Sequence, residues 1–308
     1  MQIIQDATKL ANPLRNVCVA VGVFDGVHLG HQQVIRRTIA DARQHGALAV
    51  AITFDRHPST VIAPERTPPL IYSLPQKLRA LGSLGVDAIF LIRFDLAFSE
   101  QSGDVFIRGL VQDFGRIHSI CVGSNFTFGN KRSGNVSLLK TLGQELKFSV
   151  HGLAAVSLDG KTVSSTRIRD TIRDGNLDAA SQMLGRPYSA TGLVIQGDKL
   201  GRQLGYPTAN LDVRHLALPP NAVYAVQAEV SGKTYEAVLN IGYRPTLRHP
   251  EPQLRAEVHL LDFTGDLYGR EIELTFVEKL RAEQKFASID ALKAQIGHDI
   301  IRARAVFA

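Results

Sequence analysis

Gly22-Val23-Phe24-Asp25-Gly26-Val27-His28-Leu29-Gly30-His31 is the stretch that decides the fold of the first half of the chain. An apolar run typical of a buried β-strand, residues 17–24, leads into this glycine-rich turn, and residues 32–44 follow with the apolar spacing of a helix. A helix start presents backbone N–H groups without partners and the positive end of the helix dipole, so it attracts anions. The stretch therefore predicts a phosphate site.

His28 and His31 are the residues of this turn that can take part in chemistry. Three positions apart at a helix start, they are expected to share one face and to point into one pocket. An imidazole there can donate a hydrogen bond to a phosphoryl oxygen and stabilise the charge of a transition state. The plainer alternative is a helix-capping turn with incidental histidines. A Walker motif and a first-turn G-x-G-x-x-G are both absent from the sequence.

Strand-like and helix-like segments alternate through the first half of the chain. The strand-like runs are residues 17–24, 48–54, 88–94 and 119–122, and the helix-like patterns are residues 32–44, 75–84, 103–114 and 137–142. Because these strands are apolar throughout, the alternation predicts an α/β fold, a parallel sheet with helices on both faces. Ligands of such sheets bind beyond the carboxyl ends of the strands. The turn at 22–31 and the loops at 53–58 and 122–125 should therefore converge on one crevice.

The pattern changes to the period-two alternation of antiparallel strands after about Leu184. Alternating segments lie at residues 223–230, 235–241, 255–263 and 271–277, and a closing helix is expected at 288–305 with Ile289, Leu292, Ile296 and Ile300 on one side. Short antiparallel strands joined by turns predict a small barrel. Gly185-Arg186-Pro187 is the expected boundary, which gives domains at residues 1–184 and 187–308.

Composition sets broad limits on location and partners. The chain has 308 residues, a formal net charge of +6 and 44% apolar residues, with no apolar run of membrane-spanning length and no leader-like start, so we expect a cytoplasmic protein that does not bind membranes. The basic residues are scattered without an aromatic platform, which argues against nucleic acid as a partner. Cys18 and Cys121 lie in apolar runs and are expected to be buried thiols.

A second hydroxyl-rich motif, V-S-S-T-R-I-R at residues 163–169, begins another predicted helix. Hydroxyl and backbone N–H groups at a helix start can bind a triphosphate, and an arginine can fork onto its oxygens. An ordinary helix cap with surface arginines is the alternative. The candidate phosphate ligands are Ser164, Ser165, Thr166 and Arg169.

These two motifs together resemble the adenylyltransferase half of bacterial bifunctional riboflavin kinase/FAD synthetases. Four further segments are similar to the kinase module of that family: G-L-V-I-Q-G-D-K-L-G-R-Q-L-G-Y-P-T-A-N-L at 192–211, N-I-G-Y-R-P-T at 240–246, E-V-H-L-L-D-F at 257–263 and L-R-A-E-Q-K-F at 280–286. The resemblance covers nearly the whole chain. It implies a Rossmann-like nucleotidyltransferase domain followed by a riboflavin kinase-like barrel.

The resemblance also implies two reactions and their site residues. Riboflavin would be phosphorylated by ATP in the second module, and FMN would be adenylylated to FAD in the first, with pyrophosphate released. In the first module it implies that His28 and His31 contact the ATP phosphates and that Asn125 lies near the flavin phosphate. Since FMN would attack the α-phosphorus of ATP directly, positioning and charge stabilisation would carry the catalysis.

In the second module the resemblance implies a Mg²⁺ and phosphate site at Thr208 and Asn210, and Glu257 as the base for the riboflavin 5′-hydroxyl. In the period-two pattern of that strand, Ala256 and Val258 face the core, so Glu257 and His259 point to the other face. A strand face that is simply exposed to solvent would show the same pattern. Arg281 is a further candidate contact to flavin or nucleotide. The other expected binding residues are Gly22, Phe24, Asp25, Gly30, His57, Gly197, Lys199, Gly201, Gly205, Pro207 and Asn240.

Three positions depart from the family pattern: Arg56 stands where proline is expected, Ala222 where glycine is usual, and Leu247 where phenylalanine is common. None removes a proposed catalytic group. The expected partners are riboflavin, FMN, FAD and ATP, and the chain is expected to be a monomer or weak homo-oligomer. Two other functions remain open, an RNA-binding barrel on a degenerate nucleotide fold, and a kinase that has lost the adenylyltransferase.

Overall fold

The computed structural model describes residues 1–10, 16–197, 200–246 and 249–308, and among them two compact units. The first comprises Met1–Leu70, Leu74–Arg167 and Met183–Gly185, and the second comprises Ile71–Ser73, Ile168–Gln182 and Arg186–Ala308. Residues 168–182 thus pack with the second unit. The two units are defined by which residues pack together. They do not test the boundary between functional domains expected at residues 185–187, which stays a prediction. No helix in the described ranges is long and apolar enough to cross a membrane.

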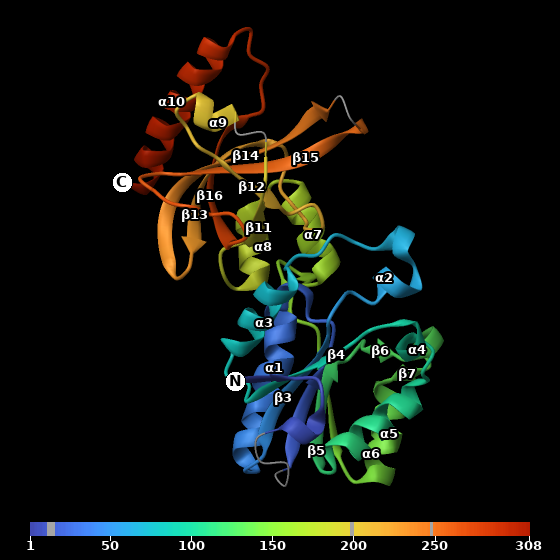
Figure 1. Cartoon of the computed structure of the whole chain (residues 1–308). Coiled ribbons are helices and arrows are strands. Elements are labelled where there is room, and N and C mark those ends of the chain that lie inside the picture. The colour runs from blue at the N-terminus through green and yellow to red at the C-terminus, as the bar shows by residue number, and fades with distance from the viewer. Residues whose placement is uncertain (11–15, 198–199, 247–248) are drawn as a thin grey trace. The chain divides into compact units, whose positions relative to one another are not determined.

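A six-stranded parallel sheet forms the first unit, in the strand order β1-β4-β3-β2-β5-β8 (Figure 1). The strands are β1 Gln2–Ile4, β2 Val17–Val21, β3 Leu48–Phe54, β4 Ala88–Ile92, β5 Ile117–Gly123 and β8 Ser149–Leu153. Strand β2 pairs in parallel with β3 on one side and with β5 on the other. The carboxyl ends of these three strands therefore lie side by side, as the sequence predicts for the loops that follow them.

Helices cover both faces of this sheet, which confirms the predicted α/β fold. One core joins Cys18, Ala20 and Ala51 to α1 and α3, and the other joins Val19 and Ile52 to α5 and α6. Figure 1 shows these helix pairs on opposite sides of the sheet. The longer helices are α1 Leu29–Gln44, α3 Leu74–Gly82, α5 Gly103–Phe114, α6 Val136–Leu146, α7 Ser165–Arg173 and α8 Leu177–Leu184.

Short elements fill the loops of the first unit. They are η1 Ala7–Lys9, η2 Asp25–Val27, α2 Ser59–Ile62, η3 Pro64–Arg66, α4 Leu96–Ser99, η4 Asn130–Arg132, and the hairpins β6 Thr127–Phe128 with β7 Gly134–Asn135 and β9 Ser157–Leu158 with β10 Lys161–Thr162. Most follow the carboxyl ends of strands, where they line the edge of the sheet that carries the predicted site.

A closed antiparallel barrel forms the core of the second unit, in the order β11-β12-β15-β14-β13-β16. Its strands are β11 Ser189–Ile195, β12 Ala209–Asp212, β13 Ala222–Val230, β14 Lys233–Thr246, β15 His249–Leu260 and β16 Glu271–Ala282, with the short helix α9 Leu200–Gln203 between the first two. The small barrel predicted from period-two alternation is confirmed. Strands β11 and β12 lie outside the four alternating segments expected from the sequence.

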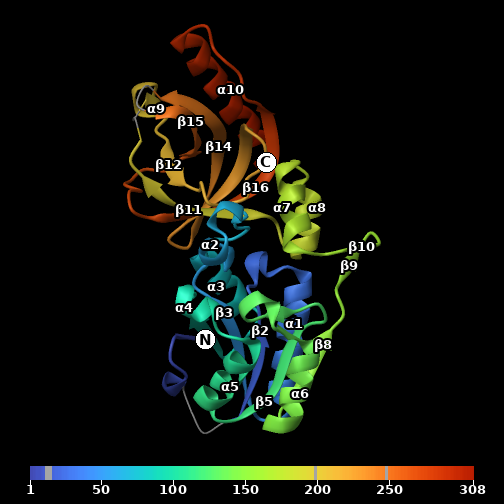
Figure 2. The same ribbon diagram turned by 90° about the vertical axis from the view of Figure 1, so that its right-hand side faces the viewer.

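The closing helix, α10 Ile289–Phe307, packs on the outside of β13, β14 and β16 (Figure 2). It covers Val223, Ala225 and Val238, which would otherwise be apolar side chains on the outer face of the barrel. Strand β13 is therefore buried on both faces over residues 222–226. Of the four residues expected on one side of this helix, Leu292, Ile296 and Ile300 are partly buried, whereas Ile289 at the first position is 64% exposed.

Candidate active sites

The turn after β2 contains two residues other than glycine in a left-handed conformation. The strand ends at Val21, three residues earlier than predicted, because Phe24 adopts φ 54° and Val27 adopts φ 41°. A left-handed conformation costs about 1–3 kcal/mol at a residue other than glycine, so the surrounding structure must hold it. At Gly22 a Cβ atom would lie 2.8 Å from the ring of Phe24, which explains the glycine there.

His28 caps helix α1, which begins at Leu29 rather than after the second histidine as predicted. The Nδ1 of His28 accepts a hydrogen bond of 3.4 Å from the backbone N–H of His31. When His28 is neutral, its proton is then on Nε2, which is the atom left to donate. Gly30, between the two histidines, packs against the His28 ring.

The rings of His28 and His31 stack, with centroids 3.6 Å apart and planes at 20°. Burial, followed by the charges of His28 and Lys77, holds the pKa of His31 well below its usual 6.5. The Nδ1 atom of His31 is buried and has no hydrogen-bond partner among the described residues. His31 is therefore a neutral imidazole at physiological pH and can serve as a hydrogen-bond donor rather than as a positive charge.

Side chains from three helices hold the backbone of this turn. The carbonyl of Val23 accepts from Lys77 on α3, that of Asp25 accepts from Ser165 on α7, and that of Val27 accepts from Gln32 on α1. The sequence interpretation placed Ser165 on phosphate, whereas the structure has its hydroxyl on the Asp25 carbonyl at 3.1 Å. Gln32 and Lys77 were not predicted, because neither belongs to a recognised motif.

The other hydroxyls of the second motif lie around the start of α7. Ser164 accepts a hydrogen bond from the N–H of Arg167, so it caps the helix, and Thr166 is exposed. The side chain of Arg167 donates to the carbonyls of Leu158 and Lys161 and so holds the small hairpin before the helix. Arg169 is buried, on the same face of α7 as Ser165 by their four-residue spacing, in the part of the helix that packs with the second unit.

The loops after β3 and β5 carry the other predicted residues of the first unit. Asp55 accepts from the N–H of Phe94 and pairs with Arg56 at 3.0 Å, so the arginine at the unusual position lies at the rim, half exposed. His57 accepts from the N–H of Ser59, and Asn125 is exposed beyond the end of β5. These loops adjoin the turn after β2, which is central in the sheet order.

An aromatic cluster lies at the same carboxyl edge, and the sequence reasoning did not single it out. The rings of Phe54, Phe94 and Phe98 contact one another with centroids 5.3–5.9 Å apart. Phe126, directly after Asn125, stacks on Phe128 with ring centroids 5.2 Å apart. Phe54 and Phe94 are buried, whereas Phe98, Phe126 and Phe128 are partly exposed, so these three are the apolar side chains that a ligand could reach at this edge.

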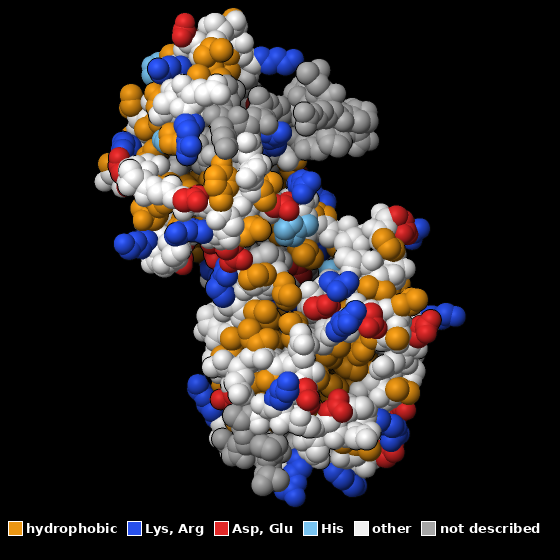
Figure 3. Space-filling view, viewed as in Figure 1, with side chains coloured by type: hydrophobic (Ala, Val, Ile, Leu, Met, Phe, Trp, Pro, Cys, Tyr) orange, Lys and Arg blue, Asp and Glu red, His pale blue; other side chains and the backbone are white. Residues whose placement is uncertain are grey.

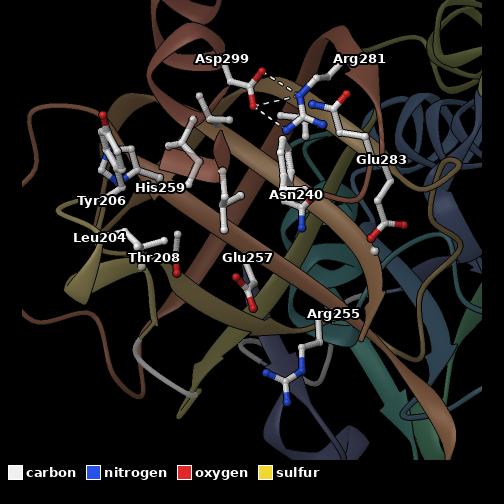
Figure 4. A pocket seen from close by; sticks show the side chains of 18 of the residues that line it. Leu204, Tyr206, Thr208, Asn240, Arg255, Glu257, His259, Arg281, Glu283 and Asp299 are labelled. Atoms are coloured by element: carbon white, nitrogen blue, oxygen red, sulfur yellow. Dashed lines mark hydrogen bonds and ion pairs between the residues drawn. The ribbon is translucent and has the colours of Figure 1, made fainter. Parts of the chain in front are cut away.

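The second candidate site is a cavity of about 330 Å³ on the outside of the barrel, partly roofed by α10. Along the wall of this cavity, a row of directly paired residues crosses five neighbouring strands. From β12 to β16 the row is Asn210, Glu257, Asn240, Val223 and Arg281, and each of the five lines the cavity. Figure 4 shows Glu257 with Thr208 and Asn240 around it.

The predicted orientation of Glu257 and His259 is confirmed. Ala256 and Val258 are buried inside the barrel, while Glu257 and His259 face the cavity. The Nδ1 of His259 contacts the carbonyl of Pro207 at 2.7 Å, which fixes the imidazole beside the P-T-A-N segment, residues 207–210. Alternation along β15 therefore aims the carboxylate at the cavity and its neighbours at the core.

Arg281 makes a different contact from the one expected of it. Its Nε and Nη2 atoms donate to the carboxylate of Asp299 on α10 at 2.9 and 2.8 Å, and Asp299 also accepts from Gln295. Figure 4 shows this pair at the α10 side of the cavity. Arg281 thus fastens the closing helix to the barrel while it lines the cavity.

Thr208 and Asn210 present oxygen donors next to Glu257, and Thr208 also lines a second cavity of about 360 Å³. No group of three or more His, Cys, Asp or Glu side chains able to hold a metal occurs in the described residues. Two neutral oxygen donors without a full protein cage suit Mg²⁺, which keeps several waters and is shared with phosphates. The donor set therefore fits the expected ion.

Two glycines of the loop before β12 pack closely against neighbouring residues of the barrel domain. A Cβ atom on Gly197 would overlap the side-chain amide of Asn210, so this glycine allows the loop to lie against the P-T-A-N segment. Gly201 packs against Tyr206 and Thr208, and Gly205 has φ 87°. Lys199 and Leu247 lie outside the described residues. Ala222 begins β13 as an ordinary strand residue, directly opposite Ile241.

Comparison with known proteins assigns both halves of the chain. The family model described as FAD synthetase matches residues 11–167, and the one described as riboflavin kinase matches residues 184–307. The bifunctional riboflavin kinase/FMN adenylyltransferase of Escherichia coli (strain K12) is 38% identical over 309 residues, which is 100% of this chain and 98% of that protein. The protein of the same name from Bacillus subtilis (strain 168) is 36% identical over 286 residues, covering 91% and 89% of the two chains.

A solved structure is also similar over 98% of both chains, with 30% identity and a TM-score of 0.80. It is the crystal structure of a protein from Streptococcus pneumoniae named a macrolide-efflux protein, and that name concerns that protein alone. The two family models occur in the order that the sequence motifs predicted. The chain belongs to the family of bifunctional riboflavin kinase/FMN adenylyltransferases and carries both enzymes of that family, the FAD synthetase first and the riboflavin kinase second.

Proposed function

We propose that riboflavin is phosphorylated in the barrel cavity with Glu257 as the general base, and that FMN is adenylylated at the turn of residues 22–31 with His28 and His31 as hydrogen-bond donors. The observation that carries the proposal is the row across the barrel. It places Glu257 directly between Asn210 and Asn240 in a cavity of about 330 Å³. This volume lies in the range of small-molecule sites, about 300–1,000 Å³.

The walls of this cavity suit a ring system with a polar tail. Val223 and Val238 of the barrel and Ile300 of α10 form an apolar side, whereas Glu257 and its amide neighbours form a polar side. An isoalloxazine ring against the apolar side would direct the ribityl chain of riboflavin toward Glu257. The carboxylate would then accept the proton of the 5′-hydroxyl as the oxygen attacks the γ-phosphorus of ATP, whose bond to the bridging oxygen breaks so that ADP leaves.

ATP is proposed to approach through the second cavity. Thr208 lines both cavities, and the second one offers the apolar and aromatic side chains Val194, Phe263 and Tyr268. Transfer of the phosphoryl group would take place where the two cavities meet, beside Thr208. Thr208 and Asn210 would hold Mg²⁺, which when bound neutralises charge on the phosphates. Gly197, Gly201, Gly205, Lys199, Pro207 and Asn240 are the proposed nucleotide or substrate contacts around them.

In the first unit, the proposed reaction is attack of the FMN phosphate on the α-phosphorus of ATP, with pyrophosphate as the leaving group. The start of α1 supplies backbone N–H groups, and His28 and His31 supply imidazole N–H groups to the phosphoryl oxygens. A neutral His31 keeps one imidazole N–H, which can donate a hydrogen bond to a phosphoryl oxygen. The partly exposed rings of Phe126 and Phe128 would receive the flavin, with Asn125 near its phosphate.

The charge distribution supports small acidic substrates over nucleic acid. On the face shown in Figure 3, Lys and Arg side chains are scattered among Asp and Glu rather than gathered in a stripe. A dispersed net charge of +6 gives weak general attraction to anions without a binding track. We propose that the chain acts in the cytoplasm as a monomer or weak homo-oligomer, without nucleic-acid or membrane partners.

The test is incubation of the full chain with riboflavin, ATP and Mg²⁺, followed by chromatographic separation of the flavins. The proposal expects FMN and then FAD, with FAD also formed from supplied FMN and ATP. Omission of Mg²⁺ in the presence of a chelator should stop both steps. Absence of both products would overturn the proposal, and FMN without FAD would leave only the kinase.

A further inference from the structure

We propose that Lys77, a residue outside both sequence motifs, is a positioning residue for adenylyl transfer, because its ammonium group holds the turn that presents His28 and His31. The inference rests on the adenylyltransferase function proposed for that turn. Lys77 lies on a separate helix, α3, which contains neither of the two phosphate-binding motifs.

All three N–H donors of the Lys77 ammonium group have partners at the carboxyl ends of the sheet. The group is 6% exposed and donates to the carbonyls of Phe54 at 2.8 Å and Val23 at 3.3 Å, and to the hydroxyl of Thr53 at 3.2 Å. The Thr53 hydroxyl in turn donates to the Val23 carbonyl at 3.0 Å. One buried cation therefore ties the turn after β2 to the end of the neighbouring strand β3.

The turn depends on such contacts more than an ordinary loop does. Phe24 and Val27 both have positive φ, a conformation that non-glycine residues keep only when their surroundings enforce it. Of the side chains that hold the turn, Lys77 is the charged one, and charge-assisted hydrogen bonds are the stronger ones. Loss of the ammonium group should therefore leave the Val23 carbonyl with the Thr53 hydroxyl alone, loosen the turn and shift the histidines that follow it.

The charged groups around Lys77 are specific. Asp25 and Asp55 attract its ammonium group, and Asp55 is itself paired with Arg56. Burial is the largest influence and lowers the pKa of Lys77 to about 8. On the side facing α1, the charge of Lys77 contributes with burial and His28 to the low pKa of His31. At neutral pH the arrangement is therefore a protonated lysine whose charge acts on a neutral imidazole.

The first experiment compares Lys77→Met with the wild-type chain and with Lys140→Met, a matched change at an exposed lysine on α6 of the same unit. FAD formation from FMN and ATP is measured as separate kcat and KM values. For Lys77→Met we expect kcat to fall by about a hundredfold, the effect of misplacing reacting groups by about 1 Å, with a much smaller change in the KM for FMN. FMN formation by the same molecules, and both activities of Lys140→Met, should be unchanged. A kcat within twofold of wild type would overturn the inference.

The second experiment follows the titration of Lys77 in the wild-type chain, so its main measurement does not depend on a substitution that could destabilise the fold. The ratio of FAD formation to FMN formation is measured from pH 7 to pH 10. This ratio should fall as the pH rises through about 8, because Lys77 loses its charge and one of its donors there. In Lys77→Arg the guanidinium stays charged, so the fall should be absent or displaced to higher pH. A ratio that is constant over this range in the wild-type chain would contradict the proposed role.

The outcomes separate this inference from the function on which it rests. A wild-type chain that makes no FAD at any pH overturns the proposed adenylyltransferase. A wild-type chain that makes FAD with a flat pH ratio, together with an active Lys77→Met variant, overturns the role of Lys77 alone.

Discussion

Glu257 on β15 lies directly opposite Asn240 on β14 in the antiparallel register of the barrel. On its other side the same carboxylate lies opposite Asn210 on β12. Two amide side chains therefore flank the one acidic group of this row, and all three line the same cavity. The amide N–H groups can orient the carboxylate without neutralising it, which is the environment a general base needs.

Replacement of Glu257 should separate the two activities. Glu257→Gln keeps the size of the side chain but removes the base, and Glu257→Ala removes both, so each should lower FMN formation by about 10²–10⁴-fold. FAD formation from supplied FMN should be unchanged, and Glu229→Gln on an exposed face of β13 serves as the matched control. The measurement is product formation by chromatography. An unchanged riboflavin kinase rate in either Glu257 variant would remove this residue as the base.

Replacement of His31 should have the opposite selectivity. His31→Ala removes one transition-state hydrogen-bond donor and should lower FAD formation by about a hundredfold or more while FMN formation is spared. His45→Ala, at the exposed carboxyl end of the same helix, is the control. Rates of both steps in each variant are to be measured in parallel. Equal loss of the two steps would contradict the assignment of two separate sites.

The low pKa of His31 should also make folding stability depend on pH. In the unfolded chain this histidine takes up a proton below about pH 6.5, whereas in the folded chain it stays neutral to much lower pH. The unfolded state therefore binds more protons as the pH falls through 6.5, and stability is lost in that direction.

Denaturant unfolding at pH 7.5 and pH 5.5 tests this pH dependence. The free energy of unfolding of the wild-type chain, relative to His31→Gln, should decrease by about 1 kcal/mol between the two pH values. The variant lacks the titrating group, so the other histidines cancel in the comparison. An equal difference at both pH values would show that His31 titrates normally.

The pair of Arg281 and Asp299 should contribute strongly to the stability of the barrel with α10. Their side chains are 19% and 6% exposed, and Arg281→Met would leave a buried carboxylate without its partner. The expected cost is about 3 kcal/mol in the free energy of unfolding. Arg302→Met, which breaks an exposed pair with Glu278 at 3.8 Å, should cost less than about 0.5 kcal/mol. Similar stabilities of the two variants would argue against the fastening role.

The sequence indicates only weakly that Lys77 is buried and has a structural role. Leu74, Leu78 and Leu81 have the spacing of an inward helix face, and Lys77 falls among them, where an apolar residue is expected. A charge on an inward face indicates a buried partner, but it does not say which one. Its partners Val23, Thr53 and Phe54 lie more than twenty residues away along the chain and are recognisable only in the folded sheet.

Local patterns in the sequence determined much of this protein. Apolar runs and periods located helix α5 and strand β3 at their observed bounds, and the phosphate motif, the P-T-A-N segment and the outward face of Glu257 were readable residue by residue. These features depend on neighbours within a few positions, where spacing and side-chain chemistry suffice. Only the tertiary structure decided the features that depend on distant pairing. The register of the barrel placed Asn210 and Asn240 beside Glu257, α10 brought Asp299 to Arg281, and α3 brought Lys77 to the turn, because hydrogen bonds between segments far apart in the sequence leave no local period.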